Sequence, residues 1–210
     1  TDPIFSKFQD DKVQLRAIVT TDHRIISFLI YPLLTILIIL APDVISFIYG
    51  NQWGQAVPYY RILMAGGFFI CLKNINSFAV AACGKSKSLF YASIFQWIML
   101  AALLTIGSWF GMLGIMWALA LNMFNIFISY AIASRIHTGQ HLSIIFKALL
   151  PSAATCALSS AIVVPIYTFT NIWWPICGIL FIVIYFGAAY LLKVKAFFET
   201  KSLLMHIIRK

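Results

Sequence analysis

Charged side chains are scarce in this sequence. Asp, Glu, Lys and Arg make up 10% of its 210 residues, and only six residues are acidic. A soluble domain carries about a quarter charged residues, because its surface has to be hydrated. Hydrophobic residues reach 62% and the mean hydropathy is +0.93. The composition therefore excludes an ordinary soluble domain and indicates a chain whose solvent is largely lipid.

Signatures of catalysis and of metal binding are also missing. The four cysteines form no CxxC pair and have no histidine at ligand spacing, so we read them as small buried hydrophobic residues. His137 and His141 are four residues apart but lie in a polar loop without a third ligand. The string Gly84-Lys85-Ser86 lacks the upstream glycine of a P-loop, and the apolar runs contain no paired carboxylates. The sequence predicts no enzyme activity, no metal and no cofactor.

Long apolar runs dominate what is present. A membrane-spanning helix needs about 20 apolar residues, and the sequence has six such runs, at 25–49, 57–83, 89–109, 113–134, 144–169 and 175–192. We therefore predict an all-α membrane protein with about six transmembrane helices. Residues 1–24 form a polar N-terminal segment, residues 25–192 the bundle, and residues 193–210 a basic tail. The tail's apolar positions suit an amphipathic helix on the membrane surface: Phe197, Phe198, Leu203, Leu204, Ile207 and Ile208.

Lysine and arginine are distributed very unevenly. The net charge is +9, and 13 of the 15 basic residues lie in segments 1–24, 84–88, 135–147 and 193–210. The intervening loops 50–57, 110–112 and 170–174 contain none. Basic loops stay on the cytoplasmic side of a membrane, so we predict that both chain ends are cytoplasmic. Short basic clusters between apolar runs do not form the basic stripe that tracks nucleic acid, and no nucleic-acid partner is expected.

Lys73 is the most unusual residue of the apolar runs. It lies inside the second run, about 18 Å along the helix from Arg61 at 1.5 Å per residue. Asn76 and Ser77 follow three and four residues later, on the same helical face. Ionisable groups inside a membrane are costly and usually face a partner or a polar cavity. We predict that Lys73 and Asn76 contact an anionic ligand, with Ser77 beside them. A lysine that extends to the membrane surface or pairs with a carbonyl is the structural alternative.

Other polar residues within the runs allow two interpretations. Asn122 and Asn125 share a face of the fourth run, and Gln96 lies in the third. They could line a substrate cavity or hydrogen-bond between helices. Asp43 and Arg61 lie near the outer ends of adjacent helices, where we expect an ion pair; hydration at the rim of a vestibule is the alternative.

Several strings resemble the C-terminal half of bacterial polysaccharide and O-antigen flippases (Wzx-type), in the multidrug/oligosaccharidyl-lipid/polysaccharide superfamily. The resemblance is densest over residues 1–90 and rests on Pro3-Ile4-Phe5-Ser6-Lys7, Arg24, Pro32-Leu33-Leu34, Ala41-Pro42-Asp43-Val44-Ile45, Tyr49-Gly50-Asn51-Gln52-Trp53 with Ala56, and Ala81-Ala82-Cys83-Gly84-Lys85-Ser86.

The resemblance implies a protein of the bacterial inner membrane with two lobes of helices around a cavity. Such a protein moves an undecaprenyl-pyrophosphate-linked oligosaccharide across the bilayer by alternating access. Its partners would be membrane lipid, that lipid-linked substrate and an N-terminal lobe that these six runs do not supply. On this reading the chain is most of one lobe and does not transport alone.

Three other functions remain open from the sequence. A drug/cation antiporter of the same superfamily would need an acidic residue deep in the lobe, whereas Asp43 lies near the outer end. A membrane enzyme of envelope assembly would need a large loop with carboxylates or arginines. A purely structural bundle is not excluded by any residue.

Overall fold

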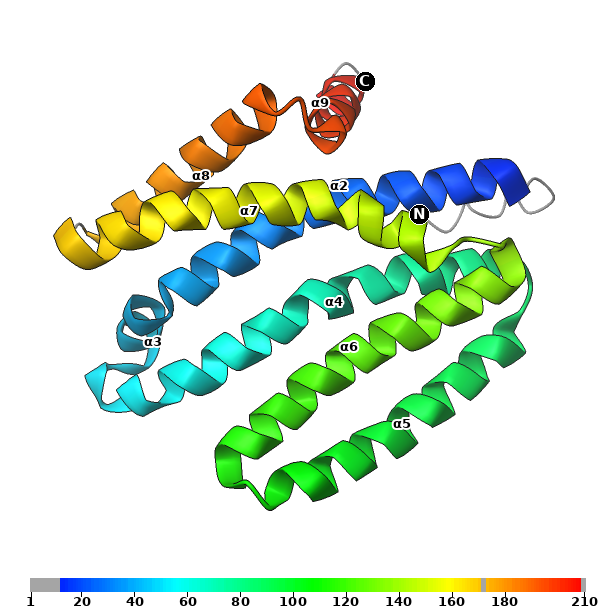
Figure 1. Cartoon of the computed structure of the whole chain (residues 1–210), viewed down its shortest axis with the longest axis horizontal. Helices are drawn as coiled ribbons and strands as arrows, with labels where there is room; N and C mark the ends of the chain where they lie inside the picture. The colour runs from blue at the N-terminus through cyan, green and yellow to red at the C-terminus, as the bar shows by residue number, and fades with distance from the viewer. Residues whose placement is uncertain (1–11, 171–172, 209–210) are drawn as a thin grey trace. The chain divides into compact units, whose positions relative to one another are not determined.

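The described part of the chain is helical. The computed structural model describes residues 12–170 and 173–208, with the backbone alone at positions 12, 170 and 203–208. No strand occurs within these ranges. The elements, shown in Figure 1, are α2 (Lys12–Ile39), α3 (Ala41–Tyr49), the 3-10 helix η1 (Asn51–Ala56), α4 (Val57–Ala82), α5 (Ser86–Ser108), α6 (Gly111–Thr138), α7 (Leu142–Thr170), α8 (Trp174–Leu191) and α9 (Lys195–Ile208).

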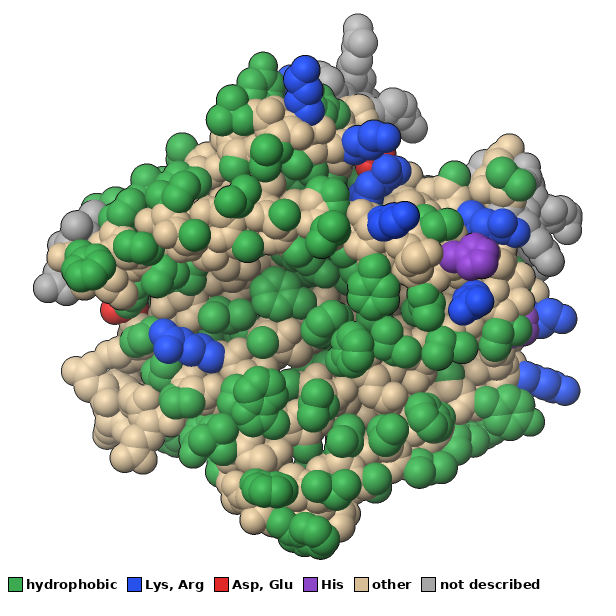
Figure 2. All heavy atoms as spheres, in the orientation of Figure 1, with side chains coloured by type: hydrophobic (Ala, Val, Ile, Leu, Met, Phe, Trp, Pro, Cys, Tyr) green, Lys and Arg blue, Asp and Glu red, His purple; other side chains and the backbone are tan. Residues whose placement is uncertain are grey.

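Among the described residues, six segments are long and apolar enough to cross a membrane: α2, α4 together with η1, α5, α6, α7 and α8. Many large hydrophobic side chains on them are exposed, among them Phe95, Trp97 and Ile182. Figure 2 shows hydrophobic side chains spread over most of the visible face. Apolar surface of this extent is stable against lipid and not against water. The predicted fold class is confirmed: the described part of the chain is all-helical, and the chain is a multi-pass membrane protein.

Helix α2 begins earlier than the first apolar run. The expected boundary at residue 24 falls inside this helix, which is continuous from Lys12 to Ile39. The reason is a stripe at four-residue intervals, since Leu15, Val19, His23 and Ser27 are all fully buried. Charged neighbours conceal this stripe in a hydropathy profile. Residues 1–11 of the predicted N-terminal segment lie outside the described residues, and its cytoplasmic location stays a prediction.

Prolines affect the helices in two ways. Pro42 lies in the first turn of α3, directly after the turn at Leu40 that ends α2. Proline is tolerated in a first turn, because that N–H has no partner within the helix. Pro32 lies inside α2, and Pro151 and Pro165 lie inside α7, and both helices continue through them.

The chain forms two compact units. Unit 1 comprises residues 1–23 and 65–148, and unit 2 comprises residues 24–64 and 149–210. The changes from one unit to the other fall within α2, α4 and α7. Each unit therefore has its own packing and is described by itself.

In unit 1, small residues let helices approach closely. A Cβ atom on Gly114 would lie 2.2 Å from the carbonyl oxygen of Gly107, at the closed end of the α5–α6 hairpin. A Cβ atom on Gly66 of α4 would lie 2.7 Å from the sulfur of Met123 on α6. Such small-residue contacts are typical of helix pairs in membranes, where dispersion and not water expulsion drives association.

The C-terminal end of α6 is closed by an arginine. Gly139 has φ +74°, and Arg16 Nε donates a hydrogen bond of 2.7 Å to the carbonyl of Thr138. The next residue, Gln140, is buried and donates to the hydroxyl of Thr20 at 2.8 Å. A cation at this position satisfies a carbonyl that the helix itself leaves without a partner.

In unit 2, an aromatic cluster packs around Phe28. Its ring centroid lies 5.2 Å from that of Tyr185 and 6.2 Å from that of Phe197, and Tyr185 Oη donates to the carbonyl of Phe28 at 3.0 Å. Arg24 and Glu199 form an ion pair of 2.9 Å. Helix α9 is thus attached to α2 by one ring and one charge pair.

This attachment bears on the predicted surface helix. The tail is helical from Lys195, but Phe197, expected on the lipid-facing side, packs into the aromatic cluster of unit 2. Phe198 is 45% exposed. The remaining apolar positions, 203, 204, 207 and 208, lie outside the described side chains.

Gly114→Ala tests the close hairpin. The added methyl group would overlap the carbonyl of Gly107 and Cβ of Phe110, so we expect a loss of about 1–3 kcal/mol in the free energy of unfolding. Gly187→Ala is the control, because nothing lies within 4 Å of a Cβ atom there and alanine favours a helix. Circular dichroism during denaturation in detergent measures both. Equal stabilities would contradict the close approach.

Candidate functional site

Five polar or aromatic residues of unit 1 form what we call the polar cluster, with Lys73 and Ser93 half-buried and the other three buried: His23, Lys73, Asn76, Ser93 and Tyr130. They come from α2, α4, α5 and α6. Lys73 and Asn76 are one helical turn apart on α4, which places both on one face. The cluster therefore joins residues that are far apart in the chain.

His23 and Asn76 form the deepest part of the cluster. Both are 0% exposed. His23 Nδ1 lies 2.7 Å from the carbonyl oxygen of Val19, and Asn76 Nδ2 lies 3.4 Å from His23 Nε2. The His23 ring packs against Phe127 with a centroid distance of 6.5 Å and an interplanar angle of 62°. Hydrogen bonding and ring packing together fix this imidazole.

Lys73 is held by an aromatic ring. Its Nζ lies 4.9 Å from the centroid of Tyr130, within the range of a cation–π interaction, worth about 0.5–2 kcal/mol depending on desolvation. The hydroxyls of Tyr130 and Ser93 are 2.9 Å apart. Because Ser93 donates its one proton to the carbonyl of Leu89 at 3.0 Å, Tyr130 is the donor to Ser93. The ring under the ammonium is thereby fixed in place.

Amides of the predicted anion contact and of the predicted cavity wall are incompletely satisfied. Asn76 Oδ1, Asn122 Oδ1 and Asn125 Nδ2 are inaccessible to solvent and have no hydrogen-bond partner among the described residues. Buried polar atoms without partners are uncommon and call for a ligand, a water or a second conformation. Ser77 and Gln96 are half-buried and make no described hydrogen bond with the cluster. That these residues line a cavity stays a prediction.

Asp43 and Arg61 have other partners than each other. In unit 2, Asp43 accepts a hydrogen bond from the hydroxyl of Tyr167 on α7. Arg61 Nε donates to the carbonyl of Ile38 at 3.1 Å, and its side chain is exposed. The predicted ion pair is thus not formed in the structure. The physical reason is that α2 ends near Arg61 and offers it an unpaired carbonyl, while α7 offers Asp43 a hydroxyl.

Sequence reasoning missed His23. It lies among the polar residues 1–24, and the histidine pair that the sequence suggests instead is His137, which the structure places in the last turn of α6, and His141, just before α7. The available signal was the four-residue spacing of Leu15, Val19 and His23, which places the histidine on the apolar face of a helix.

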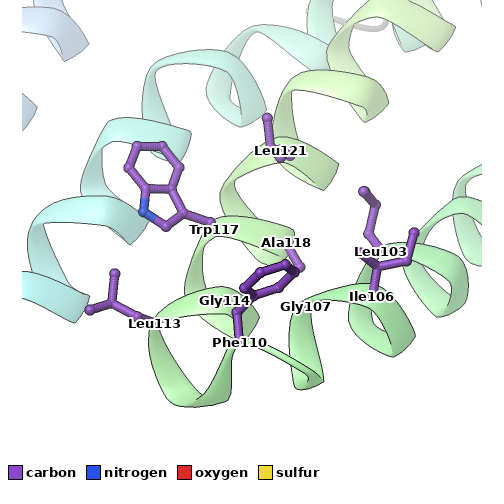
Figure 3. Close-up of a pocket in the computed structure, with 9 residues that line it drawn as sticks. All are labelled: Leu103, Ile106, Gly107, Phe110, Leu113, Gly114, Trp117, Ala118 and Leu121. Carbon is purple, nitrogen blue, oxygen red and sulfur yellow. The ribbon is translucent and has the colours of Figure 1, made fainter.

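A groove of about 380 Å³ lies between α5 and α6, away from the cluster (Figure 3). Phe110, Trp117 and the backbone of Gly107 and Gly114 form part of its wall. All of its lining residues are apolar. It contains none of the predicted site residues, and the indole of Trp117 is its one lining side chain with a polar group.

Comparison with known proteins gives two matches. Residues 1–58 match the family described as polysaccharide biosynthesis protein. Over 113 residues the chain is 30% identical to a Klebsiella pneumoniae protein described as an uncharacterized membrane protein in the cps region. That alignment covers 53% of this chain and 23% of the relative, so the chain spans less than a quarter of that relative's length. No solved structure matches significantly.

Paired substitutions at Tyr130 test the cation–π contact. Tyr130→Phe keeps the ring and loses the bond to Ser93, whereas Tyr130→Leu loses both. We expect Tyr130→Leu to be less stable than Tyr130→Phe by about 0.5–2 kcal/mol beyond the difference in packing. The packing difference is obtained by repeating both substitutions in a Lys73→Met background. The free energies of unfolding are measured by chemical denaturation in detergent. If the difference between Tyr130→Leu and Tyr130→Phe is the same with Lys73 as with Lys73→Met, the ring does not stabilise Lys73.

Proposed function

We propose that this chain, whose residues 1–58 match the family described as polysaccharide biosynthesis protein, forms part of a flippase-type transporter for a lipid-linked oligosaccharide. Lys73 and Asn76 contact the anionic group of this substrate, which the resemblance to flippases gives as a pyrophosphate. The proposal follows from family and from site together, because the family alone does not assign a residue to the substrate.

The carrying observation is the uncompensated charge of Lys73. Among the described residues its ammonium has a ring as partner and no carboxylate. A lysine near the centre of a bilayer costs about 2.5–3.5 kcal/mol, and a ring returns only part of that. A bound anion would return the rest. The charge is therefore available to a substrate in a way that an ion-paired lysine is not.

The competing functions have less support. A cation antiporter needs a deep acidic residue with free ligand atoms, and Asp43 is already bonded to Tyr167. A membrane enzyme of envelope assembly would need a large loop with carboxylates or arginines, and the loops between the described helices are short. A transporter of this kind requires only a charged group and a polar surface that bind the substrate, and helices that move.

The chain is expected to work with further helices. It spans 23% of the matched relative, and alternating access needs a second lobe against which the first can move. We propose that these six spans belong to one lobe and that the second lobe is the N-terminal part of the same protein. The whole assembly then alternates between two openings.

Membrane orientation has its own test. We propose insertion in the bacterial inner membrane with both ends of the chain in the cytoplasm, because the basic segments are cytoplasmic by the positive-inside rule. Single cysteines at Lys87 and at Met112, both exposed, in a cysteine-free background, should react with an impermeant maleimide from opposite sides. We expect Met112→Cys to react in intact cells and Lys87→Cys only in inverted vesicles. The reverse pattern would refute the orientation.

Lys73 provides the functional test. In the full-length protein, Lys73→Ala should abolish export of the lipid-linked glycan, and Lys73→Arg should retain part of it, because arginine keeps the charge but not its shape. Lys147→Ala is the matched control, since that lysine is exposed in the same unit. Export is followed by surface glycan, with protein amounts equalised by immunoblot. Normal export by Lys73→Ala would remove Lys73 from the substrate path.

A further inference from the structure

We propose that His23 is the positioning residue of this anion site: it orients the Asn76 amide so that Asn76 Oδ1 accepts a hydrogen bond from a hydroxyl next to the substrate's anionic group. The inference rests on the proposed function and adds to it a residue and a substrate feature. It predicts that the site distinguishes a sugar-bearing anion from a bare one.

The protonation of the His23 ring follows from its neighbours. Nδ1 faces the carbonyl of Val19 at 2.7 Å, and a carbonyl can only accept, so Nδ1 carries a proton. In neutral imidazole the other nitrogen is then an acceptor. Nε2 faces Asn76 Nδ2 at 3.4 Å, and an amide nitrogen can only donate. Both contacts agree with one neutral tautomer.

The orientation of Asn76 follows from that tautomer. The amide of an asparagine side chain can flip by about 180° at little energetic cost unless a neighbouring group favours either the oxygen or the nitrogen at its position. His23 Nε2 does so, because it attracts the NH2 group and repels the carbonyl oxygen. Asn76 Oδ1 therefore points away from His23 and has no partner among the described residues. The site offers an acceptor whose direction is set by the histidine.

The ring itself cannot readily turn away. His23 is 0% exposed, and its face packs against Phe127, whose ring also contacts Phe69 and Phe146 at centroid distances of 6.1 Å each. A packed core of this kind keeps side chains in one rotamer. His23 Nε2, which accepts the hydrogen bond from the Asn76 amide, therefore has a fixed position.

The two polar groups of the site call for a particular ligand. Lys73 supplies a positive charge, and Asn76 Oδ1, one turn further along the same face of α4, supplies a hydrogen-bond acceptor. A matching ligand carries a negative charge and a nearby donor. The pyrophosphate of a sugar-linked lipid has this pair, with a sugar hydroxyl as donor beyond the charged group, whereas the same lipid pyrophosphate without sugar ends at its phosphate and places no hydroxyl there. Oδ1 is closed to solvent in this structure, so the donor reaches it after the surrounding helices open.

Two probes separate the roles of the residues. Affinities of the full-length protein in nanodiscs are measured for polyprenyl pyrophosphate and for the same lipid bearing one sugar. One hydrogen bond should make the sugar-bearing probe about tenfold tighter. Lys73→Ala should weaken both probes, while Asn76→Ala should abolish the difference between them. His23→Phe should do the same, and adding it to Asn76→Ala should change nothing further.

Conservative and control variants complete the test. His23→Gln should keep much of the selectivity, because its amide oxygen can accept from Asn76. Asn74→Ala and His141→Phe, both exposed positions, should leave the ratio unchanged. If His23→Phe keeps the ratio, or if it weakens both probes equally, His23 has no positioning role. Weak binding of both probes that Lys73→Ala leaves unaltered would instead contradict the proposed function.

The tautomer can be read without any substrate. Nitrogen-15 magnetic resonance of histidine-labelled full-length protein, with the His23→Gln spectrum subtracted, reports which nitrogen carries the proton. We expect a neutral ring protonated at Nδ1. A proton on Nε2 would overturn the inference even if the binding ratios agreed, and this measurement also decides the matter if His23→Phe does not fold.

Discussion

Hydrocarbon offers no hydrogen bonds, and this single constraint governs the arrangement of the chain. Every polar group that enters the membrane has to find its partner within the protein. The described backbone meets the requirement by being helical almost throughout. Hydroxyl side chains meet it locally: Thr20, Ser129 and Ser159 each donate to the carbonyl four residues earlier. Against this regularity the atoms that lack partners stand out.

Several of those exceptions lie on α4 and α6 of unit 1. Asn76, Asn122 and Asn125 each keep an unpaired amide atom, and Lys73 has an aromatic ring where a carboxylate would be the usual partner. A structural bundle would gain by replacing these residues with apolar ones. Their cost is explained if a substrate completes the bonds during part of a transport cycle.

Much of this was predictable from the sequence. Hydropathy predicted the six spans and the fold class, because a run of about 20 apolar residues usually forms a membrane-spanning helix. The family predicted from short strings is supported by both comparisons. Spacing placed Lys73 and Asn76 on one face. The tertiary contacts of these side chains could not be predicted from the sequence. The ring beneath Lys73 belongs to a residue 57 positions away, and Asp43 accepts a hydrogen bond from Tyr167. His23 was not recognised as buried, because the charged residues beside it lower the mean hydropathy of every window that contains the buried stripe.

The end of α6 places a constraint on how such sequences can diverge. At Gly139 a side chain would meet both an unfavourable backbone angle and the Arg16 guanidinium, 2.7 Å from where its Cβ would stand. Positions 16 and 139 are 123 residues apart in sequence and yet lie in direct contact. A lineage that replaced the glycine would have to release the arginine from the carbonyl of Thr138, so positions 16 and 139 are expected to change together. A pair of this kind records the contact between α2 and α6 in sequence, where it survives after most of the apolar residues have been exchanged for one another.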